Sequence, residues 1–403
     1  MLTLADVEAA RERVARTARA TPLEYSNTYS SMTGADVHLK LETFQRTGAF
    51  KIRGATNRIA TLPEEDRARG VIAASAGNHA QGVALAATRV GVDSTIVMPE
   101  HAPRAKVQAT RGYGAEVVLH GPDYDAAAEH AHELERDRGL TYVHPFDDEA
   151  VMAGQGTIGL EILEDCPDVE TVVVPVGGGG LISGIAAAVK GHDPDVRVIG
   201  VQAAGASSAA PSLEKGERVE IDGVATIADG IATRSIGERT FANMREYVDE
   251  VVTVTDAEIA VTMVYLLERS KTVVEGAGAV GLAATLFEAF EYDEGETIVP
   301  VLSGGNVDMN TLTTVIRRGL GEMGRYLKLR TVLDDRPGSL EEVIAVVSAH
   351  DANIYAIHHD RTSREIELDD AEVELELEVG GADHAETLVE ALRGSGYEVT
   401  VLQ

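Results

Sequence analysis

The sequence is poor in cysteine, aromatic residues and lysine. Its 403 residues include one cysteine, Cys166, no tryptophan, and seven lysines against 28 arginines. A lone cysteine excludes an internal disulfide, and its neighbours Asp165 and Pro167 offer nothing that would activate a thiol. Because lysine is scarce, a lysine with apolar neighbours is not expected to be an ordinary surface residue.

Basic charge is also scarce, since the formal net charge is -31. This balance excludes nucleic acid and anionic membranes as partners. Acidic residues spread along the chain, with arginine in place of lysine, favour a halophilic protein, because molar salt would screen their repulsion. The uncharged residues 171–189 contain Pro175 and four glycines, which would break a membrane-spanning helix. No apolar N-terminal stretch predicts a signal peptide, so we expect a cytoplasmic protein.

The lysine that stands out is Lys51, which lies between Phe50 and Ile52 among small and apolar residues. Burial there would favour the neutral amine, the nucleophile that forms a Schiff base with an aldehyde. Taken alone, the segment is more typical of a lysine whose stem is buried while its amine reaches water. Three loops further along the chain favour the first interpretation, because with Lys51 they could complete a pyridoxal phosphate (PLP) site.

The first of these loops, the serine loop, comprises residues 75–79 and joins an apolar run at 70–74 to a helical pattern at 83–90. N–H groups and polar side chains at a helix N-terminus form a receptor for a carboxylate. An ordinary helix cap with a polar turn would use the same residue types. The residues predicted to bind the substrate are Ser75, Ala76, Gly77, Asn78 and His79.

The second loop, the glycine loop, follows a buried-strand pattern at residues 171–176 and precedes a helical pattern at 181–190. Four residues without side chains let the backbone wrap an anion, and the helix dipole favours its charge. The loop matches neither the dinucleotide fingerprint nor a Walker loop. We predict a phosphate cup made by Gly177, Gly178, Gly179, Gly180 and Leu181.

The third loop begins at Ser303, directly after a strand pattern at residues 297–302. A hydroxyl at the end of a strand, backed by Gly304 and Gly305, can approach a flat ring edge closely. A hydroxyl partner leaves a pyridine nitrogen largely unprotonated and makes the ring a weaker electron sink than a carboxylate partner would. Such tuning suits β-elimination better than transamination.

These segments, in this order, resemble the fold-type II PLP enzymes, and most closely the threonine dehydratases (threonine ammonia-lyases). The resemblance extends from about Thr21 to the C-terminus. It implies that Lys51 carries PLP beside Phe50, and that the serine loop binds the substrate carboxylate and, through Asn78, the cofactor. It also implies that Ser303 faces the pyridine nitrogen and that Glu275 lies near the ring.

The implied reaction converts L-threonine to 2-oxobutanoate and ammonia, and L-serine to pyruvate. One methyl group discriminates between substrates by only about 1–3 kcal/mol. The similar serine racemases place a second serine where this chain has Ala76, so we expect elimination instead of racemisation. They also place carboxylates after the strand that ends near Val201, where this chain has Gln202. We therefore expect no metal.

Helical and strand patterns alternate from residue 75 to 306, which predicts an α/β fold with mostly parallel sheets and helices on both faces. The resemblance implies two lobes with the cofactor between them. Residues 39–145 would form a small domain inserted into a large domain of residues 1–38 and 146–320. It further implies a homo-oligomer, a dimer or tetramer.

Residues 326–403 have a different pattern, which predicts a βαββαβ module with glutamates on one face of the strand at 371–379. The module resembles the ferredoxin-like ACT domain, with the Asp-Arg-Pro-Gly-Ser-Leu loop at 335–340 as its most specific marker. The resemblance implies a regulatory site for isoleucine or valine. A plain oligomerisation domain is the alternative. The residues predicted to bind the effector are Gly338, Ser339, Leu340, Asn353 and Ile354.

Other functions stay open at this point. A nicotinamide-dependent dehydrogenase could use the glycine loop, but it would leave Lys51 unexplained. A catalytically inactive amino-acid sensor could use the ACT-like module alone. Within PLP chemistry, serine dehydratase, serine racemase and β-replacement are alternatives.

Overall fold

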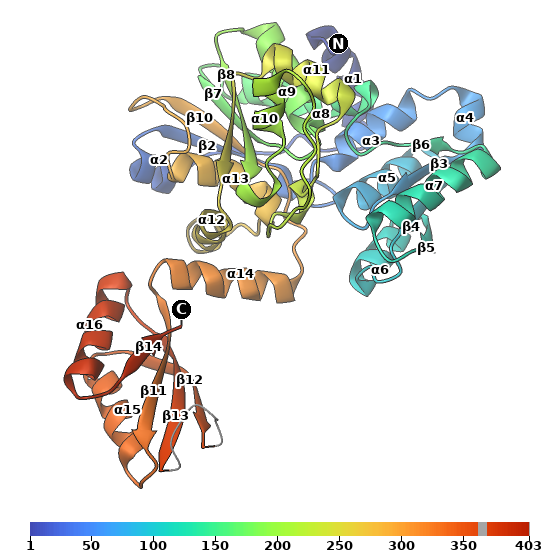
Figure 1. The fold of residues 1–403 in the computed structure, drawn as a ribbon. Helices are drawn as coiled ribbons and strands as arrows, with labels where there is room; N and C mark the ends of the chain where they lie inside the picture. The colour runs from blue at the N-terminus through green and yellow to red at the C-terminus, as the bar shows by residue number, and fades with distance from the viewer. Residues whose placement is uncertain (362–368, 403) are drawn as a thin grey trace. The chain divides into compact units, whose positions relative to one another are not determined.

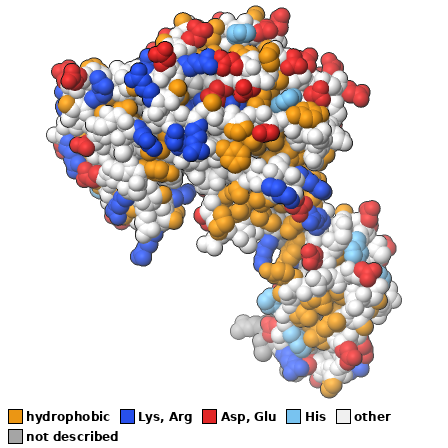
Figure 2. Space-filling model, turned by 180° about the vertical axis from the view of Figure 1, so that it is seen from behind, with side chains coloured by type: hydrophobic (Ala, Val, Ile, Leu, Met, Phe, Trp, Pro, Cys, Tyr) orange, Lys and Arg blue, Asp and Glu red, His pale blue; other side chains and the backbone are white. Residues whose placement is uncertain are grey.

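The computed structural model describes residues 1–361 and 369–402. The chain divides into two compact units, Met1–Asp308 and Met309–Gln403, coloured by residue number in Figure 1. All the predicted catalytic residues lie in the first unit, and the predicted ACT-like module lies in the second. Figure 2 shows acidic side chains scattered over the visible face instead of gathered in one patch. No helix of the described part of the chain is both long and apolar enough to cross a membrane.

The first unit contains a six-stranded sheet in which all neighbours are parallel except the first pair. Its central strands are fully buried and rich in valine, which is typical of a parallel sheet covered on both faces. The predicted strand at 297–302 is confirmed to the residue. The order is β1 (Leu23–Tyr25), β2 (Asp36–Leu41), β10 (Thr297–Leu302), β7 (Thr171–Pro175), β8 (Arg197–Ala203) and β9 (Glu250–Val254).

A second, four-stranded sheet is parallel throughout. All its strands come from within residues 39–145, the segment predicted to be inserted. β2 begins before residue 39 and belongs to the six-stranded sheet, so the chain leaves that sheet only after Leu41. The order of the small sheet is β5 (Glu116–Leu119), β4 (Ser94–Met98), β3 (Val71–Ala74) and β6 (Thr141–Tyr142).

Helix α3 (Lys51–Ala60) packs between α5 (Asn78–Val90) and α8 (Glu149–Asp165), and glycines allow the close approach. A Cβ added at Gly154 would lie 2.6 Å from the Arg53 carbonyl oxygen, and one added at Gly82 would lie 3.0 Å from the backbone of Ile52. Contacts this short leave no room for a side chain. The helix that begins at Lys51 is therefore held by backbone packing on two sides.

The other helical segments of the first unit pack on the two sheets or on the helices that cover them. They are α1 (Leu4–Ala15), α2 (Asn27–Thr33), η1 (Glu42–Phe44), α4 (Glu64–Arg69), α6 (Arg104–Gly112), α7 (Tyr124–Arg138), α9 (Gly180–His192), η2 (Ala204–Ala206), α10 (Ala209–Lys215), η3 (Asp229–Ile231), α11 (Glu238–Tyr247), α12 (Asp256–Arg269) and α13 (Gly276–Leu286).

The second unit begins with α14 (Met309–Glu322), followed by an antiparallel sheet with two helices. The element order confirms the predicted βαββαβ pattern. Burial alternates along β13, with aliphatic residues inside and glutamates toward Lys328 and Arg330, as the sequence predicts. The sheet order is β12 (Asn353–Asp360), β13 (Asp370–Glu378), β11 (Tyr326–Asp334) and β14 (Val399–Val401), and the helices are α15 (Ser339–Ala349) and α16 (Ala382–Gly394).

Candidate active site

The segment before Lys51 is pinned to the loop that follows β10. The Phe50 N–H donates to the Ser303 carbonyl over 3.1 Å, Ala49 forms an isolated bridge with Gly304, and the Asn306 amide donates to the Thr47 carbonyl over 2.6 Å. Two predicted loops, far apart in the sequence, are therefore joined through their backbones. This union places Lys51, the first residue of α3, beside the end of the central strand.

The Lys51 amine is enclosed, although the residue as a whole is intermediate in exposure. Its Nζ donates to the Pro145 carbonyl over 2.8 Å and lies 5.0 Å from the centroid of the Phe50 ring. Burial lowers the pKa of Lys51 to about 8, and the charge of Glu275 offsets part of this effect. A large fraction of the amine is neutral at mildly basic pH, which is the form that a nucleophile or base requires.

The serine loop contacts the loop that follows β10 through Asn78, at the start of α5. The Asn78 amide donates to Glu275 Oε1 over 2.6 Å, and its oxygen accepts from Asn306 over 2.8 Å. A Cβ added at Gly77 would meet no atom within 4 Å, so this backbone borders open space. Ser75 Oγ accepts from the Gly77 N–H over 3.1 Å, which closes the turn.

His79 and Ala76 point into protein. The His79 ring is buried, and its Nε2 lies 2.8 Å from the Val143 carbonyl. Burial, together with the charge of Lys51, lowers the pKa of His79 to about 3, so its ring is neutral at physiological pH. Ala76 packs against the core of the small sheet. Of the serine loop, the backbone and the Ser75 and Asn78 side chains are the groups available to a ligand.

Glu275 precedes α13, where an acidic residue is usually a solvated cap, but this carboxyl is enclosed and caps no helix N–H. Burial raises the pKa of Glu275, and the hydrogen bond from Asn78 works against that rise. A Cβ at Gly304 would lie 2.5 Å from Glu275 Oε1. A side chain at position 304 would displace this carboxyl.

The glycine loop connects β7 to α9, and Gly179 has a φ of 93°. Added Cβ atoms would lie 2.4 Å from the Phe146 ring at Gly178 and 2.9 Å from Thr240 at Gly179. The carbonyls of Gly178 and Gly179 accept hydrogen bonds from protein groups. Within the described residues, the N–H groups of all four glycines have no protein acceptor. Free N–H groups at a helix N-terminus fit a phosphate.

Ser303 and Leu181, both predicted to bind the cofactor, differ in which of their groups could do so. The Ser303 hydroxyl is buried and lies 3.5 Å from the Ala277 carbonyl, the limit of a hydrogen bond, so it can bond to a ligand instead. The Leu181 side chain packs in the core of the large sheet. Any contact of Leu181 with a phosphate must therefore use its backbone N–H.

The sequence analysis missed residues 144–147, which we call the HPFD turn. Its Pro145 carbonyl accepts from Lys51, its Phe146 ring covers the glycine loop, and the Asp147 carboxylate accepts from three N–H groups at the start of α11. The pattern His-Pro-Phe-Asp directly after a strand was visible in the sequence. Its importance lies in backbone contacts, which residue types do not reveal.

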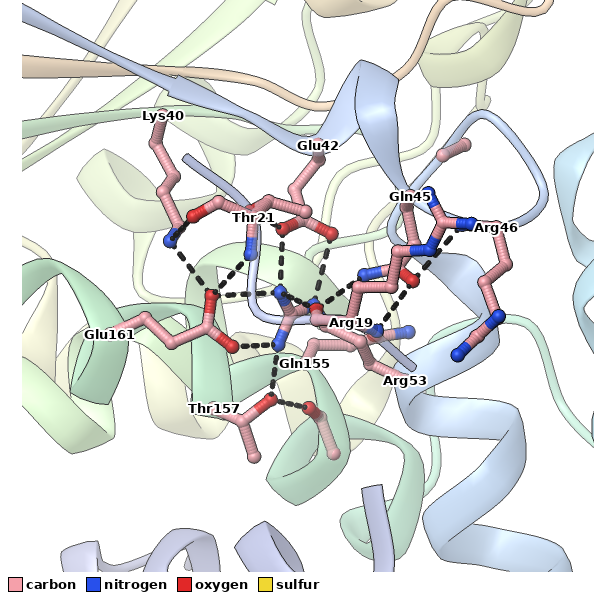
Figure 3. A network of polar contacts seen from close by, with 12 residues as sticks. Arg19, Thr21, Lys40, Glu42, Gln45, Arg46, Arg53, Gln155, Thr157 and Glu161 are labelled. Atoms are coloured by element: carbon pink, nitrogen blue, oxygen red, sulfur yellow. Dashed lines mark hydrogen bonds and ion pairs between the residues drawn. The ribbon is translucent and has the colours of Figure 1, made fainter. Parts of the chain in front are cut away.

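A buried ionic network surrounds Arg53 of α3 (Figure 3). Arg53 is 1% exposed and forms ion pairs with Glu42 over 2.7 Å and Glu161 over 2.6 Å. Glu161 also pairs with Lys40, which is fully buried, over 2.7 Å. Two cations and two carboxylates balance, which is how charge is tolerated inside a protein. The network fixes the helix whose first residue is Lys51.

Among the described residues, no three His, Cys, Asp or Glu side chains are grouped so that they could hold a metal ion. Gln202, at the position where serine racemases are expected to carry a carboxylate, is buried. Its amide donates to the Val176 carbonyl and accepts from the Ala209 N–H. Both polar atoms of the Gln202 side chain are therefore used in hydrogen bonds within the protein.

The predicted effector residues do not meet within one copy of the second unit. Asn353 pairs with Glu378 in the sheet, whereas Asp334, which leads to the loop with Gly338 and Ser339, pairs with Asp370. Eight steps along β13 separate the two ends, about 27 Å at the usual rise per residue. The buried Ser339 hydroxyl has no hydrogen-bond partner among the described residues.

Comparisons with known proteins agree with this geometry. The family model described as pyridoxal-phosphate dependent enzyme matches residues 14–304. Over the full length of both chains, the sequence is 48% identical to an L-threonine ammonia-lyase of Thermotoga maritima and 50% identical to one of Geobacter sulfurreducens. The solved threonine deaminase isoform 2 of Solanum lycopersicum superposes with a TM-score of 0.76 at 41% identity, covering 78% of this chain and 92% of that one.

Proposed function

Because this chain belongs to the family of pyridoxal-phosphate dependent enzymes, we propose how its residues perform the reaction of an L-threonine ammonia-lyase. The chain is a PLP-dependent lyase that releases ammonia and 2-oxobutanoate from L-threonine. The observation that carries the residue roles is the convergence of Lys51, the serine loop, the glycine loop and Ser303 on one place. We propose L-serine as a second substrate, which would give pyruvate.

The convergent residues fit PLP. Lys51 would hold the cofactor covalently with Phe50 beside the ring, and the free N–H groups of the glycine loop would hold its phosphate. Ser303 would meet the ring nitrogen, and Asn78 and Glu275 would lie near the ring. When bound, PLP supplies an electron sink that acidifies the Cα proton of an amino acid.

The protein groups then divide the remaining work. The serine loop would bind the substrate carboxylate through N–H groups and the Ser75 hydroxyl. The neutral Lys51 amine would take the Cα proton, and its lowered pKa of about 8 makes this form more abundant near neutral pH than it is for an ordinary lysine. Ala76 offers no acid to the opposite face, so a proton cannot be returned there and elimination prevails over racemisation.

A single assay tests this function. The purified protein with PLP is given L-threonine, L-serine and D-serine separately, and the release of 2-oxo acid is measured. We expect 2-oxobutanoate from L-threonine, pyruvate from L-serine and no product from D-serine. Conversion of L-serine to D-serine as the main reaction would instead establish a racemase.

We further propose that the second unit is an ACT-type regulatory domain that binds isoleucine or valine. The support is its βαββαβ order and the buried, unpartnered Ser339 hydroxyl at the start of α15. Since Asn353 and Gly338 lie at opposite ends of one sheet, a site that uses both needs two copies of the chain. This proposal therefore includes a homo-oligomer, a dimer or tetramer.

Isoleucine titration of the full-length enzyme tests the regulation. We expect isoleucine to raise the apparent KM for threonine, because an inhibitor must bind two states unequally. Ser339→Ala should weaken this response, whereas Ser348→Ala, on the exposed face of the same helix, should not. An unchanged response in Ser339→Ala would remove the effector site from this loop.

We also propose that the protein is halophilic, which its net charge of -31 supports. A cytoplasmic location stays a prediction. Activity is expected to rise between dilute buffer and molar potassium chloride. Equal activity and stability in both would remove the halophilic proposal.

A further inference from the structure

The HPFD turn is closed by one histidine side chain. His144 Nδ1 accepts from the Phe146 N–H over 3.2 Å and from the Asp147 N–H over 2.8 Å. Pro145 lies inside this turn, and its ring fixes φ. The Phe146 N–H belongs to the same planar peptide as the Pro145 carbonyl, so the bond that ties it to the imidazole sets the direction of that carbonyl.

That carbonyl is the acceptor of the reacting amine. Lys51 Nζ donates to Pro145 oxygen over 2.8 Å. Residues near Pro145 contact other parts of the site. The oxygen of Val143, just before the turn, lies 2.8 Å from His79 Nε2, and the ring of Phe146, within the turn, lies against Gly178. A change in the conformation of the turn would therefore shift both the Lys51 amine and the glycine loop.

We propose that His144 is a positioning residue, whose neutral imidazole holds the Pro145 carbonyl where it receives and orients the Lys51 amine. The proposal rests on the role of Lys51 in the proposed function. Nδ1 can accept two N–H groups only when it carries no proton, so the ring proton must sit on Nε2. Protonation of Nδ1 would bring its N–H group against the N–H groups of Phe146 and Asp147. Three donors without an acceptor would repel one another and open the turn.

The surroundings of His144 favour this neutral form. Burial lowers the pKa of His144, and the nearby charges act in both directions. Asp147 and Asp148 raise that pKa, whereas Lys51 from α3 and His132 from α7 lower it. The ring also makes edge contacts with Tyr142, at 6.3 Å between centroids, and Phe146, at 4.6 Å. The turn should therefore stay closed at neutral pH and open as the solution becomes acidic.

Two substitutions separate positioning from simple packing. His144→Asn keeps a short side-chain acceptor for backbone N–H groups but cannot titrate. His144→Phe keeps a ring for the contacts with Tyr142 and Phe146 but has no acceptor. The two variants are compared with the natural enzyme in kcat and KM for threonine across pH, and in the rate at which the apoprotein forms its covalent adduct with PLP.

We expect His144→Phe to lower kcat by about 10- to 100-fold with KM changed less than about threefold, because a misplaced base slows chemistry without weakening carboxylate binding. Its adduct formation should slow as well. His144→Asn should restore most of both rates at pH 8, and its kcat should fall less steeply on the acid side than that of the natural enzyme, because only protonation of Lys51 then slows the reaction. Normal kcat and adduct formation in His144→Phe would overturn the proposal, as would an unchanged acid limb in His144→Asn.

The remaining outcomes also decide the matter. If His144→Phe does not fold, as judged by its thermal transition, His144→Asn and its pH profile carry the test alone. A folded His144→Asn that is as slow as His144→Phe would also count against positioning through an acceptor. If no variant and not even the natural enzyme releases 2-oxobutanoate, the proposed function fails, while adduct formation still reports on His144.

Discussion

Lys51 and Arg53 stand two residues apart on α3, and both are enclosed, but the protein treats the two cations differently. Two steps along a helix turn a side chain to nearly the opposite side. Within the described residues no carboxylate lies at ion-pair distance from Lys51, and burial lowers its pKa to about 8. Burial acts on Arg53 as well, but Glu42 and Glu161 outweigh it and raise the pKa of the guanidinium. Burial without a partner makes a reactive amine, and burial with partners makes a structural charge.

The largest loss of activity should follow from removing Lys51, the cation without an ion-pair partner among the described residues. Lys51→Ala should lower threonine deamination by at least about 10³-fold, because in the proposed function this residue both holds PLP and moves the Cα proton. The fold should persist, since Lys51 makes one hydrogen bond. Turnover and the absorbance of bound PLP are measured beside Lys215→Ala, which alters an exposed lysine. Normal turnover with a reducible PLP adduct in Lys51→Ala would refute the assignment.

Removing the paired cation should instead damage stability. Arg53→Met leaves the buried Glu42 without a cationic partner and Glu161 with Lys40 alone, which costs about 3–5 kcal/mol. Arg11 pairs with Glu164 at the surface, so Arg11→Met should cost at most about 1 kcal/mol. Urea midpoints of the apoproteins distinguish the two. Similar midpoints for both variants would mean that the internal network contributes no more than a surface pair.

The same two residues illustrate what the sequence could predict. Lys51 was identifiable because its own neighbours are apolar and because strands followed by glycines mark the loops around it. These are local patterns, and the strand at 297–302 and the βαββαβ module were likewise found from periodicity. Local patterns report what a segment forms by itself.

Arg53 was not identifiable in this way, because its partners Glu42 and Glu161 lie 11 and 108 positions away. The role of Pro145 was hidden for another reason, since its contact to Lys51 uses a backbone carbonyl that every residue has. The placement of Asn353 far from Gly338 depends on strand register, which a single sequence leaves open. Long-range partners, backbone contacts and register are what the folded chain adds.

A third buried base, His79, extends the comparison to stability and pH. Its pKa is about 3 in the folded protein and about 6.5 when unfolded. Above pH 6.5 neither state binds the proton, so the contribution of the neutral ring is fully present. As pH falls toward 3, only the unfolded state is protonated, and the free energy of unfolding should drop by about 1.4 kcal/mol per pH unit.

His79→Gln is the matched variant, because its amide can still donate to the Val143 carbonyl but does not titrate. Urea unfolding at several pH values should show a shallower decline for His79→Gln than for the natural chain. Parallel declines would show that His79 is protonated in the folded state and that burial does not hold it neutral.

The smallest effect concerns how fast the apoprotein takes up PLP. Only the neutral Lys51 amine can attack the aldehyde, and with a pKa of about 8 its neutral fraction rises from roughly one tenth at pH 7 to nine tenths at pH 9. The rate of adduct formation should therefore rise about tenfold and then level off. Glu275→Gln removes the charge that raises the pKa of Lys51, so its curve should lie at lower pH, whereas Glu164→Gln, at the surface, should leave the curve in place. A midpoint near 10.5 in the natural chain would show a solvated amine, and the contrast with Arg53 would then rest on ion pairing alone.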